Sequence, residues 1–493
     1  MKRLAPALRR LFARRVASIV AIAAAVTVPT LPSLVSRYGY SDDYWFLGYE
    51  KSGRDLVHDL TRDHARPVLG LVYAIGRPMV GSIDGLVWAR LFGLAGVLAL
   101  ALAMRWAARS AGFSERFALA LAIGVGLLPG VQLYVVWASG APIGWVSALS
   151  IVASQQLVSA GPSLPLATRV RVVAFLAISA LTYQPAVGFF VVGLVLALLS
   201  PRPDPEPRRQ IRRHTSALAA ALAVVLAWMV GARLTLGKAD RTGLSHRPLH
   251  KASWFVTEVL DNATNAFDIT PSHVVEVVVL GLIATVIVVI SRRYGRRQGP
   301  IVAAALVAAL PVSYTPNLIA VETWAAYRTL AALSTLVLVF VLVAAREISQ
   351  FVAASVSRAL TRRRLDAAFS LALVAATAVI AAVVATTMYD DLIRPQTDEL
   401  AAFRGALRAT YDDDPDTIAV RQLVEPPSPP ARYDEFRMPS LAKEWVPVGL
   451  ARATLRADGR DPDATRIVRL APGDPAPAGA TVIEIRISAP PGA

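Results

Sequence analysis

The chain has 493 residues, of which 55% are hydrophobic and 17% are charged, whereas a soluble domain carries about 25% charge, so this composition excludes an ordinary globular enzyme. The sequence has no cysteine, which excludes disulfides, a thiol nucleophile and a thiolate metal site. The net charge of +16 suggests nucleic acid if the cations cluster on a soluble surface, so their positions along the chain decide the class of partner.

Apolar runs of about 20 residues, long enough to cross about 30 Å of hydrocarbon, recur over most of the chain. The run over residues 172–200 is too long for one crossing and is broken by Tyr183, Gln184 and Pro185. We interpret it as a hairpin of two short helices, which brings the expected total to about eleven transmembrane helices. The other expected crossings are residues 16–35, 85–107, 117–138, 142–160, 216–236, 273–290, 300–312, 329–345 and 366–388.

The positions of Lys and Arg support this topology, because these residues resist translocation. With the amino terminus in the cytoplasm, the loops on that side hold 25 Lys and Arg against five Asp and Glu. A single crossing over residues 172–200 would put either Arg169 and Arg171 or the arginines of the next loop on the wrong side. The membrane therefore explains the positive charge, and we expect no nucleic-acid partner. The first 35 residues resemble a signal peptide without a small-residue cleavage site, so we predict an uncleaved first crossing.

The crossings divide the chain into a transmembrane domain, residues 1–388, and an extracytoplasmic tail domain, residues 389–493. Three outer loops are expected, at residues 37–83, 237–272 and 313–328. Within the first loop, the apolar segment 67–83 is too short for a full crossing and is interpreted as an interfacial or re-entrant helix.

The tail pattern predicts a small α/β domain. Residues 397–409 have apolar residues at helical spacing, whereas 418–423 and 480–487 have the composition of strands. The proline-rich stretch 425–439 is predicted to be a loop. The predicted fold is therefore an all-α polytopic membrane protein with a small α/β tail.

The first outer loop begins with a pair of acidic residues, in Tyr40-Ser41-Asp42-Asp43-Tyr44-Trp45. Adjacent carboxylates just outside a crossing can meet a headgroup or a sugar, and one can act as a general base or a metal ligand. Alternatively, a helix begins at Ser41 and its first turn favours acidic residues. Both interpretations stay open on spacing alone, and any metal ion, Mg2+ or Mn2+, would be held by Asp42 and Asp43.

The same loop ends at Asp63-His64-Ala65-Arg66-Pro67, where the apolar segment starts. Arg66 is placed either to hold a lipid phosphate through two hydrogen bonds or to anchor the chain to ordinary headgroups.

These motifs together carry a family resemblance. A paired aspartate after the first crossing, an aromatic neighbour and an Arg-Pro that opens an interfacial segment are similar to the polytopic GT-C glycosyltransferases. The closest resemblance is to the glucosyltransferases that transfer glucosyl units from a polyprenyl-phosphate donor to surface polysaccharide. Those proteins also have a Tyr-Gln pair in a broken apolar segment, matched by Tyr183-Gln184, and an arginine in a late outer loop, matched by Arg328. The resemblance covers roughly residues 16–345 as topology, and the tail has no counterpart in it.

The resemblance implies a GT-C-like fold and sugar transfer at the outer face of a bacterial plasma membrane. Asp42 or Asp43 would deprotonate an acceptor hydroxyl, which attacks the anomeric carbon of a sugar on a lipid phosphate, while Arg66 and Arg328 would stabilise the departing phosphate. The implied partners are a polyprenyl-phosphate sugar donor, a cell-envelope glycan or lipid acceptor, and membrane lipids. The substrate-binding candidates are Tyr44, His64, Tyr183, Gln184 and Glu322.

Other polar residues near the crossings have two interpretations each. Arg90 lies in an apolar crossing and either faces the bundle interior or extends to the interface. Glu322 either contacts Arg328 or an acceptor, or is a solvated loop acid. Tyr183-Gln184-Pro185 either binds a sugar or forms a proline kink, which explains the proline but not the glutamine. The basic cluster 246–251 suits anionic headgroups or a donor phosphate better than a metal.

The main rival function is a polytopic transporter or a flippase for lipid-linked sugars, which would place polar residues at mid-membrane and on both faces. A polysaccharide polymerase or ligase and a scaffold that presents the tail are further alternatives. The acidic pair and the aromatic-polar clusters lie in the outer loops, so the pattern favours chemistry at the interface over passage through the bundle.

Overall fold

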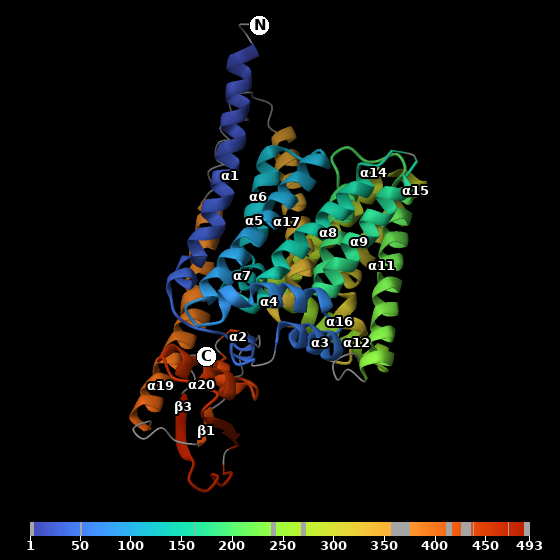
Figure 1. Cartoon of the computed structure of the whole chain (residues 1–493). Coiled ribbons are helices and arrows are strands. Elements are labelled where there is room, and N and C mark those ends of the chain that lie inside the picture. Colours follow the sequence, from blue (N-terminus) through green and yellow to red (C-terminus); the bar gives the residue numbers. More distant parts are fainter. Residues whose placement is uncertain are drawn as a thin grey trace.

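The computed structural model describes residues 4–49, 52–161, 163–237, 243–267, 273–355, 375–410, 417–424, 435–436, 438–471 and 473–487. A bundle of helices makes up most of it, and a small domain with a three-stranded sheet lies at one end of the bundle (Figure 1). The helices of the bundle are α1 (Leu4–Val35), α5 (Leu86–Ser110), α6 (Glu115–Leu127), α7 (Pro129–Val136), α8 (Pro142–Val158), α9 (Leu166–Thr182), α10 (Gly188–Leu198), α11 (Pro207–Leu236), α14 (His273–Arg293), α15 (Gly295–Ser313), α17 (Tyr327–Ser355) and the helix Ala375–Ala409.

Seven helices in the described ranges are long and apolar enough to cross a membrane. The pair α6 and α7 becomes an eighth if it is counted as one crossing bent by 57°. The bend falls at Pro129, which has no N–H to donate to the preceding helix. The side-chain amide of Gln132 donates to the carbonyl of Gly126 at this break. The helical membrane-protein architecture is confirmed, but eleven crossings are not, because α9 and α15 do not meet this criterion and Gln184–Leu198 is an apolar helix of less than crossing length.

The broken apolar run folds as the hairpin interpretation predicts. Helix α9 ends at Thr182, a 3-10 turn covers Gln184–Val187, and α10 follows. Near the end of α9, Ser179 Oγ donates to the carbonyl of Val146 at 3.0 Å, close to the start of α8. Gly193 of α10 instead packs against Ser154, towards the end of α8. Since α9 and α10 run in opposite directions along α8, the chain turns back at Tyr183.

The arginine-rich loops come together at one end of the bundle. Arg293 and Glu347 form an ion pair between α14 and α17, and Arg208 donates to the carbonyl of Arg297 at 3.3 Å. The opposite end carries α2 (Asp42–Leu47), α3 (Gly53–His64), α4 (Pro67–Val80), α12 (Pro248–Trp254), α16 (Thr315–Ile319) and the tail domain (Figure 1). The expected segregation of inner and outer loops is therefore present as a difference between the two ends.

The second and third outer loops are joined to each other. Leu244 and Ala320 form an antiparallel bridge. Lys251, only 3% exposed, donates to the carbonyl of Asn317 at 3.2 Å and to that of Glu322. The cluster 246–251 is thus divided, because this lysine is used within the protein whereas His246, Arg247 and His250 are exposed.

Arg90 is buried inside the bundle, 1% exposed. It donates to the carbonyls of Ser33 at 3.1 Å, Ser36 at 3.3 Å and Tyr38 at 2.6 Å. These carbonyls lie at and just beyond the end of α1, where helical partners run out and a cation is favoured. Arg90 therefore faces the interior of the bundle and does not extend to the interface. Its hydrogen bonds fix the direction in which the chain leaves α1 for the first outer loop.

The tail domain is a parallel sheet covered by helices. Its strands are β1 (Thr417–Val424), β2 (Arg466–Leu470) and β3 (Thr481–Ile487), in the order β2-β1-β3. Helix α20 (Val446–Ala457) connects β1 to β2, since parallel strands need a crossover. Strand β2 and helix α20 were not predicted. The expected loop 425–439 and the first part of the last crossing, 366–374, lie largely or wholly outside the described residues.

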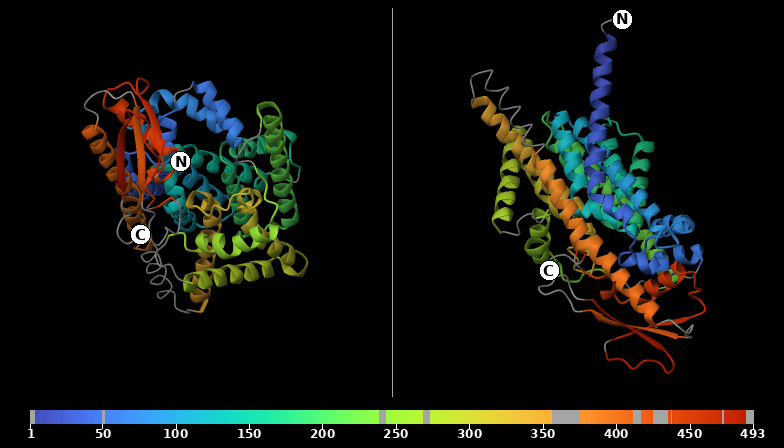
Figure 2. Two further views of the ribbon diagram at one scale, coloured as in Figure 1. Left: turned by 90° about the horizontal axis from the view of Figure 1, so that it is seen from below. Right: turned by 90° about the vertical axis from the view of Figure 1, so that its left-hand side faces the viewer.

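The helix predicted over 397–409 is not a separate element. It is the end of one helix of 35 residues, Ala375–Ala409, that continues from the bundle into α19 (Arg394–Thr410). A π-helical turn at Tyr389–Ile393 interrupts it without ending it. Figure 2 shows this helix passing along the bundle to the sheet.

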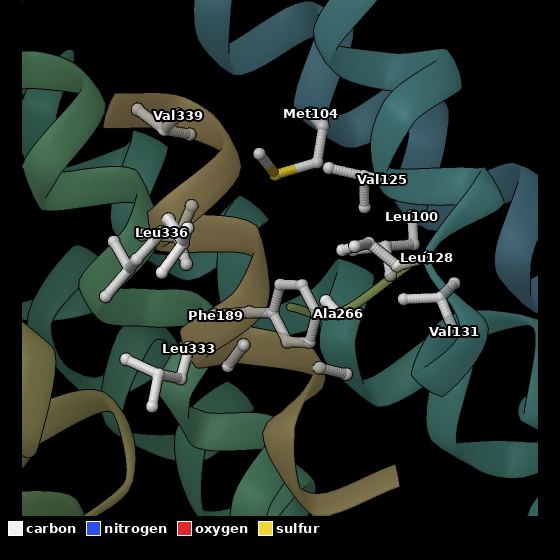
Figure 3. Close-up of a cluster of buried hydrophobic side chains, with 14 of the residues drawn as sticks. Leu100, Met104, Val125, Leu128, Val131, Phe189, Ala266, Leu333, Leu336 and Val339 are labelled. Carbon is white, nitrogen blue, oxygen red and sulfur yellow. The ribbon is translucent and has the colours of Figure 1, made fainter. Parts of the chain in front are cut away.

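The centre of the bundle is a continuous apolar core. Figure 3 shows Leu100 of α5, Val131 of α7, Phe189 of α10 and Leu333 of α17 meeting there. Trp137, Tyr183 and Arg328 lie where the chain enters or leaves these helices, at the end of the bundle that carries the tail domain. The core therefore holds these side chains at fixed positions relative to one another.

Candidate active site

Asp43 is held by the loop between α7 and α8. Its Oδ1 accepts hydrogen bonds from the Ser139 N–H at 2.7 Å and from the Ser139 hydroxyl, and its Oδ2 accepts from the Tyr40 N–H at 3.0 Å. It is 1% exposed, and burial raises its pKa while these hydrogen bonds act in the opposite direction. Both carboxylate oxygens are thus already engaged in joining the first outer loop to the bundle.

Asp42, by contrast, is half-buried at the first position of α2. Its Oδ1 accepts a hydrogen bond of 3.1 Å from Trp445 Nε1 of the tail domain. The preceding Ser41 has a positive φ of 46°, an uncommon conformation for a residue with a side chain. The N–H of Ser41 donates to Ser440 Oγ at 2.8 Å. Two contacts from the tail domain therefore set the position of Asp42.

Arg66 caps the start of α4 and meets the hairpin between α9 and α10. Its Nε donates to Gln184 Oε1 at 2.9 Å, and its guanidinium lies 5.2 Å from the centre of the Tyr183 ring. Burial lowers the pKa of Arg66, and the charge of Arg328 acts in the same direction. The structure thus brings together the arginine of the first loop and the Tyr-Gln pair, which are 118 residues apart in sequence.

Arg328 lies between two indole rings and beside a tail carboxylate. Its guanidinium is 4.3 Å from the Trp137 ring centre and 5.8 Å from that of Trp324, a cation–π arrangement. Its Nε lies 3.4 Å from Glu435 Oε1, and Glu435 Oε2 accepts the Tyr327 N–H at 2.7 Å. The acidic partner of Arg328 is Glu435, not the Glu322 that sequence spacing suggested.

The two arginines and Asp42 form one electrostatic cluster. The charge of Asp42 acts on both Arg66 and Arg328, and both arginines act on Tyr183. The Tyr183 hydroxyl lies near enough to Arg328 to interact with its side chain, whereas Trp137 Nε1 is buried and has no hydrogen-bond partner among the described residues. Because leaving a buried polar group unpaired is costly, Trp137 Nε1 is suited to receive a polar ligand.

The other predicted site residues have different surroundings. Tyr44 is buried, 1% exposed, and its hydroxyl accepts the Gly39 N–H at 3.0 Å. His64 is half-buried as the last residue of α3, two positions before Arg66. Glu322 is half-buried beside Lys251.

Metal ligands do not gather at this site. No group of three or more His, Cys, Asp or Glu that could hold a metal lies within the residues that the structure describes. Both oxygens of Asp43 accept protein hydrogen bonds. Of the two carboxylates that the sequence suggested as metal ligands, Asp42 is thus the more accessible.

The tail domain packs on α2 with its backbone. A Cβ built on Gly449 of α20 would lie 2.0 Å from the carbonyl oxygen of Tyr44. A Cβ on Gly48 would lie 2.5 Å from the Cα of Gly449. Arg456 donates to the carbonyl of Leu47 at 3.0 Å and caps the end of α2. The contact is possible only because both positions are glycine.

Sequence reasoning missed three residues of this site: Trp137, Glu435 and Trp445. Trp137 follows α7 directly, and only the fold places it against Arg328. The two tail residues lie more than a hundred positions from their partners, and no local spacing marks them.

The comparisons with known proteins identify no family. No protein-family model and no curated protein matches the chain. Among solved structures, the crystal structure of the Archaeoglobus fulgidus oligosaccharyltransferase in complex with Zn and sulfate is similar, with a TM-score of 0.45 and 12% sequence identity. The match covers 91% of this chain and 62% of that protein, so this chain spans less than two thirds of its length.

Proposed function

We propose that this protein is a membrane glycosyltransferase of the GT-C type, which transfers a sugar from a polyprenyl-phosphate donor to a cell-envelope glycan or lipid. The observation that carries the proposal is that two arginines, Arg66 against the Tyr183-Gln184 hairpin and Arg328 beside Glu435, lie in one electrostatic cluster with the half-buried carboxylate of Asp42. Such a cluster suits a reaction in which a proton is removed at one point and negative charge develops at another.

In the proposed reaction, the Asp42 carboxylate takes the proton of an acceptor hydroxyl. The hydroxyl oxygen forms a bond to the anomeric carbon of the donor sugar. The bond from that carbon to the phosphate oxygen breaks, and its electron pair leaves with the lipid phosphate. Arg66 and Arg328 stabilise the charge that develops on the phosphate. Asp43 does not take the proton, because both of its oxygens accept hydrogen bonds that position the loop.

The arginines keep donors for a phosphate in this arrangement. Within the described residues, the contact of Arg66 with Gln184 and that of Arg328 with Glu435 both use Nε. The terminal N–H groups of a guanidinium match phosphate oxygens in pairs. Gln184 and Glu435 thus act as positioning residues, and Trp137 Nε1 is a buried donor that the sugar or the phosphate can use.

A lipid-linked donor is supported by α4, which begins directly after Arg66. Leu71, Ile75 and Met79 of α4 are 52%, 70% and 60% exposed. Their spacing of four residues places them on one face of the helix. An exposed apolar stripe of this kind lies in a membrane interface. A prenyl chain that follows this stripe would bring its phosphate to Arg66.

The orientation of the chain is part of the proposal. The arginine-rich end would face the cytoplasm of a bacterial cell, and the end with the site and the tail domain would lie outside the plasma membrane. The transporter alternative is less well supported, because the cluster of Asp42, Arg66 and Arg328 lies at one end of the bundle instead of at its middle.

The direct test is transfer of labelled sugar from defined polyprenyl-phosphate donors to cell-envelope acceptors by the purified protein. We expect Asp42→Asn to lower the rate by about 10²- to 10⁴-fold, the usual contribution of a general base. The matched control is Asp398→Asn, which removes an exposed carboxylate of the tail helix and should transfer at the wild-type rate.

Equal rates for wild type and Asp42→Asn would refute the assignment of the base. If no donor supports transfer by well-folded wild-type protein, the glycosyltransferase proposal is abandoned. Flux of lipid-linked sugar across vesicles then becomes the assay for the transporter alternative.

A further inference from the structure

A cavity of about 650 Å³ lies at the arginine-rich end of the bundle, far from Asp42 in the fold. Helices α9 and α11 and the end of α8 line it. Its charged lining residues are Arg169, Arg209, Arg212 and Arg213. The proposed transfer reaction uses none of these residues.

The lining residues of α11 form one helix face. Arg209, Arg212, Arg213, Ser216 and Ala220 all line the cavity, and steps of three and four residues bring side chains to the same side of a helix. The polarity of this face decreases along the helix: its first turns carry arginines, the next turn carries a serine, and the last part carries small apolar residues.

Helix α9 repeats the same gradient. Arg169 lines the cavity near its first turn, and Val173 lines it one turn later. Both helices begin at the arginine-rich end and run into the bundle. The cavity is therefore cationic towards the arginine-rich end of the bundle and apolar one to two turns further along both helices.

The positive charges of the cavity are only partly compensated. Arg169, Arg209 and Arg212 all lie near enough to Arg213 for their charges to repel its own, and Asp204 acts on Arg213 in the opposite direction. Within the described residues, Arg209 pairs with Glu206 at 3.0 Å, and no carboxylate forms an ion pair with Arg169 or Arg212. Four arginines that converge on one hollow raise the local potential well above that of scattered surface cations.

Arg213 is also fixed in place. It is 8% exposed, and its guanidinium donates to the carbonyls of Ala160 at 3.1 Å and Gly161 at 2.7 Å. These carbonyls belong to the turn between α8 and α9, so Arg213 connects α11 to that turn on the opposite side of the cavity. A preorganised cation of this kind needs little reordering when an anion binds.

We propose that this cavity is a binding site for one anionic phospholipid, with the phosphate at Arg169, Arg212 and Arg213 and an acyl chain along Val173 and Ala220. The order of groups in the cavity, cationic, then hydroxyl, then apolar, follows the order of phosphate, ester and acyl chain in the lipid. Basic pockets between membrane helices bind anionic headgroups in this way. The site is independent of the proposed glycosyl transfer.

Native mass spectrometry of the full-length protein tests the site. The protein is purified from a mixture of equal parts phosphatidylglycerol and phosphatidylcholine, and the bound lipids are counted. We expect wild type to retain phosphatidylglycerol in excess. Replacing both exposed arginines, Arg169→Gln with Arg212→Gln, should reduce that preference by about 30-fold, from the usual contribution of two basic residues at a membrane surface.

The matched control removes the same charge from the same end of the bundle. Arg292 and Arg296 are exposed and do not line the cavity. The double variant Arg292→Gln with Arg296→Gln should keep the wild-type preference. An equal loss in both double variants would show a general surface potential and overturn the site.

A variant that retains every arginine separates the cavity from its charge. Ala220 is exposed at the apolar part of the lining, and Ala220→Trp should fill the acyl path and abolish retention of phosphatidylglycerol. Full retention by Ala220→Trp, or no preference in the wild type, would overturn the proposal. Since none of these measurements involves sugar transfer, their outcome is distinguishable from that of the proposed function.

Discussion

Replacing Gly449 by alanine tests whether the tail domain has to be docked on α2 for the site to form. The new Cβ would lie 2.0 Å from the carbonyl oxygen of Tyr44, where contact is ordinarily about 3.4 Å or more, so α20 and α2 would have to separate by about 1.4 Å. Neither atom belongs to a flexible side chain that could move aside.

A separation of this size lengthens several contacts beyond hydrogen-bond range. Arg456 to the Leu47 carbonyl, 3.0 Å, and Trp445 to Asp42, 3.1 Å, would both exceed 4 Å. Two lost hydrogen bonds cost about 1–1.5 kcal/mol each, and overpacking costs about 1–3 kcal/mol. The helical preference for alanine over glycine returns about 1 kcal/mol. The net loss of docking free energy is therefore about 2–5 kcal/mol.

Gly405 provides the matched control, because it lies in α19 and a Cβ there would meet no atom within 4 Å. Gly405→Ala should stabilise the tail domain by about 0.5–1 kcal/mol. Amide hydrogen exchange in β1 and α20, together with turnover, measures both variants. We expect faster exchange and slower transfer in Gly449→Ala only, since Trp445 would no longer hold Asp42. Equal protection in the two variants would refute the backbone-contact argument.

Three further predictions concern the site. Asp43→Asn should destabilise the protein by about 2–4 kcal/mol, because an amide cannot accept all of the hydrogen bonds that the carboxylate accepts. Asp42→Asn should leave the stability unchanged, and thermal unfolding of both variants checks this. A larger loss of stability in Asp42→Asn than in Asp43→Asn would exchange the roles of the two residues. Arg66→Ala should weaken donor binding by about 1.5–3 kcal/mol, measured as the dissociation constant for the lipid-phosphate sugar; unchanged affinity would make Arg66 a headgroup anchor. Glu435→Gln should lower the unfolding temperature, because Arg328 loses its anionic partner. Added donor should raise that temperature more in Glu435→Gln than in wild type, and an equal rise would show that Arg328 does not bind the phosphate.

The parts of the fold that sequence predicts are those fixed by local composition. Long apolar runs gave most bundle helices, because crossing hydrocarbon requires them. The break at Tyr183 followed from polar residues and a proline within one run. The helix of the last predicted crossing continues past 388, since the change from apolar to polar residues marks the edge of the apolar segment and not the end of the helix. Strand β2, only five residues long, was too short to recognise.

The site is predictable only in part, because its partners come from distant segments. Asp42 and Arg66 lie in a loop that the sequence singled out. Asp42 and Asp43 differ in role because only Asp43 is held by the loop that contains Ser139, which lies 96 residues from Asp43 in sequence. Glu435 contacts Arg328 from a proline-rich stretch that has no functional pattern of its own. Such contacts follow from tertiary packing, and a single sequence does not encode them in its spacing.

Because one continuous helix leads from the bundle to the sheet, the number of residues in that helix fixes the distance of the tail domain from the bundle. Its 35 residues span about 52 Å, which exceeds the thickness of the hydrocarbon, about 30 Å. Each residue added above the membrane would lift the sheet by about 1.5 Å and turn it by about 100°, carrying Trp445 away from Asp42. The π-helical turn at Tyr389–Ile393 holds the kind of one-residue insertion that shifts this phase. The length of this segment can therefore change only together with the surface of α2 on which the tail domain packs.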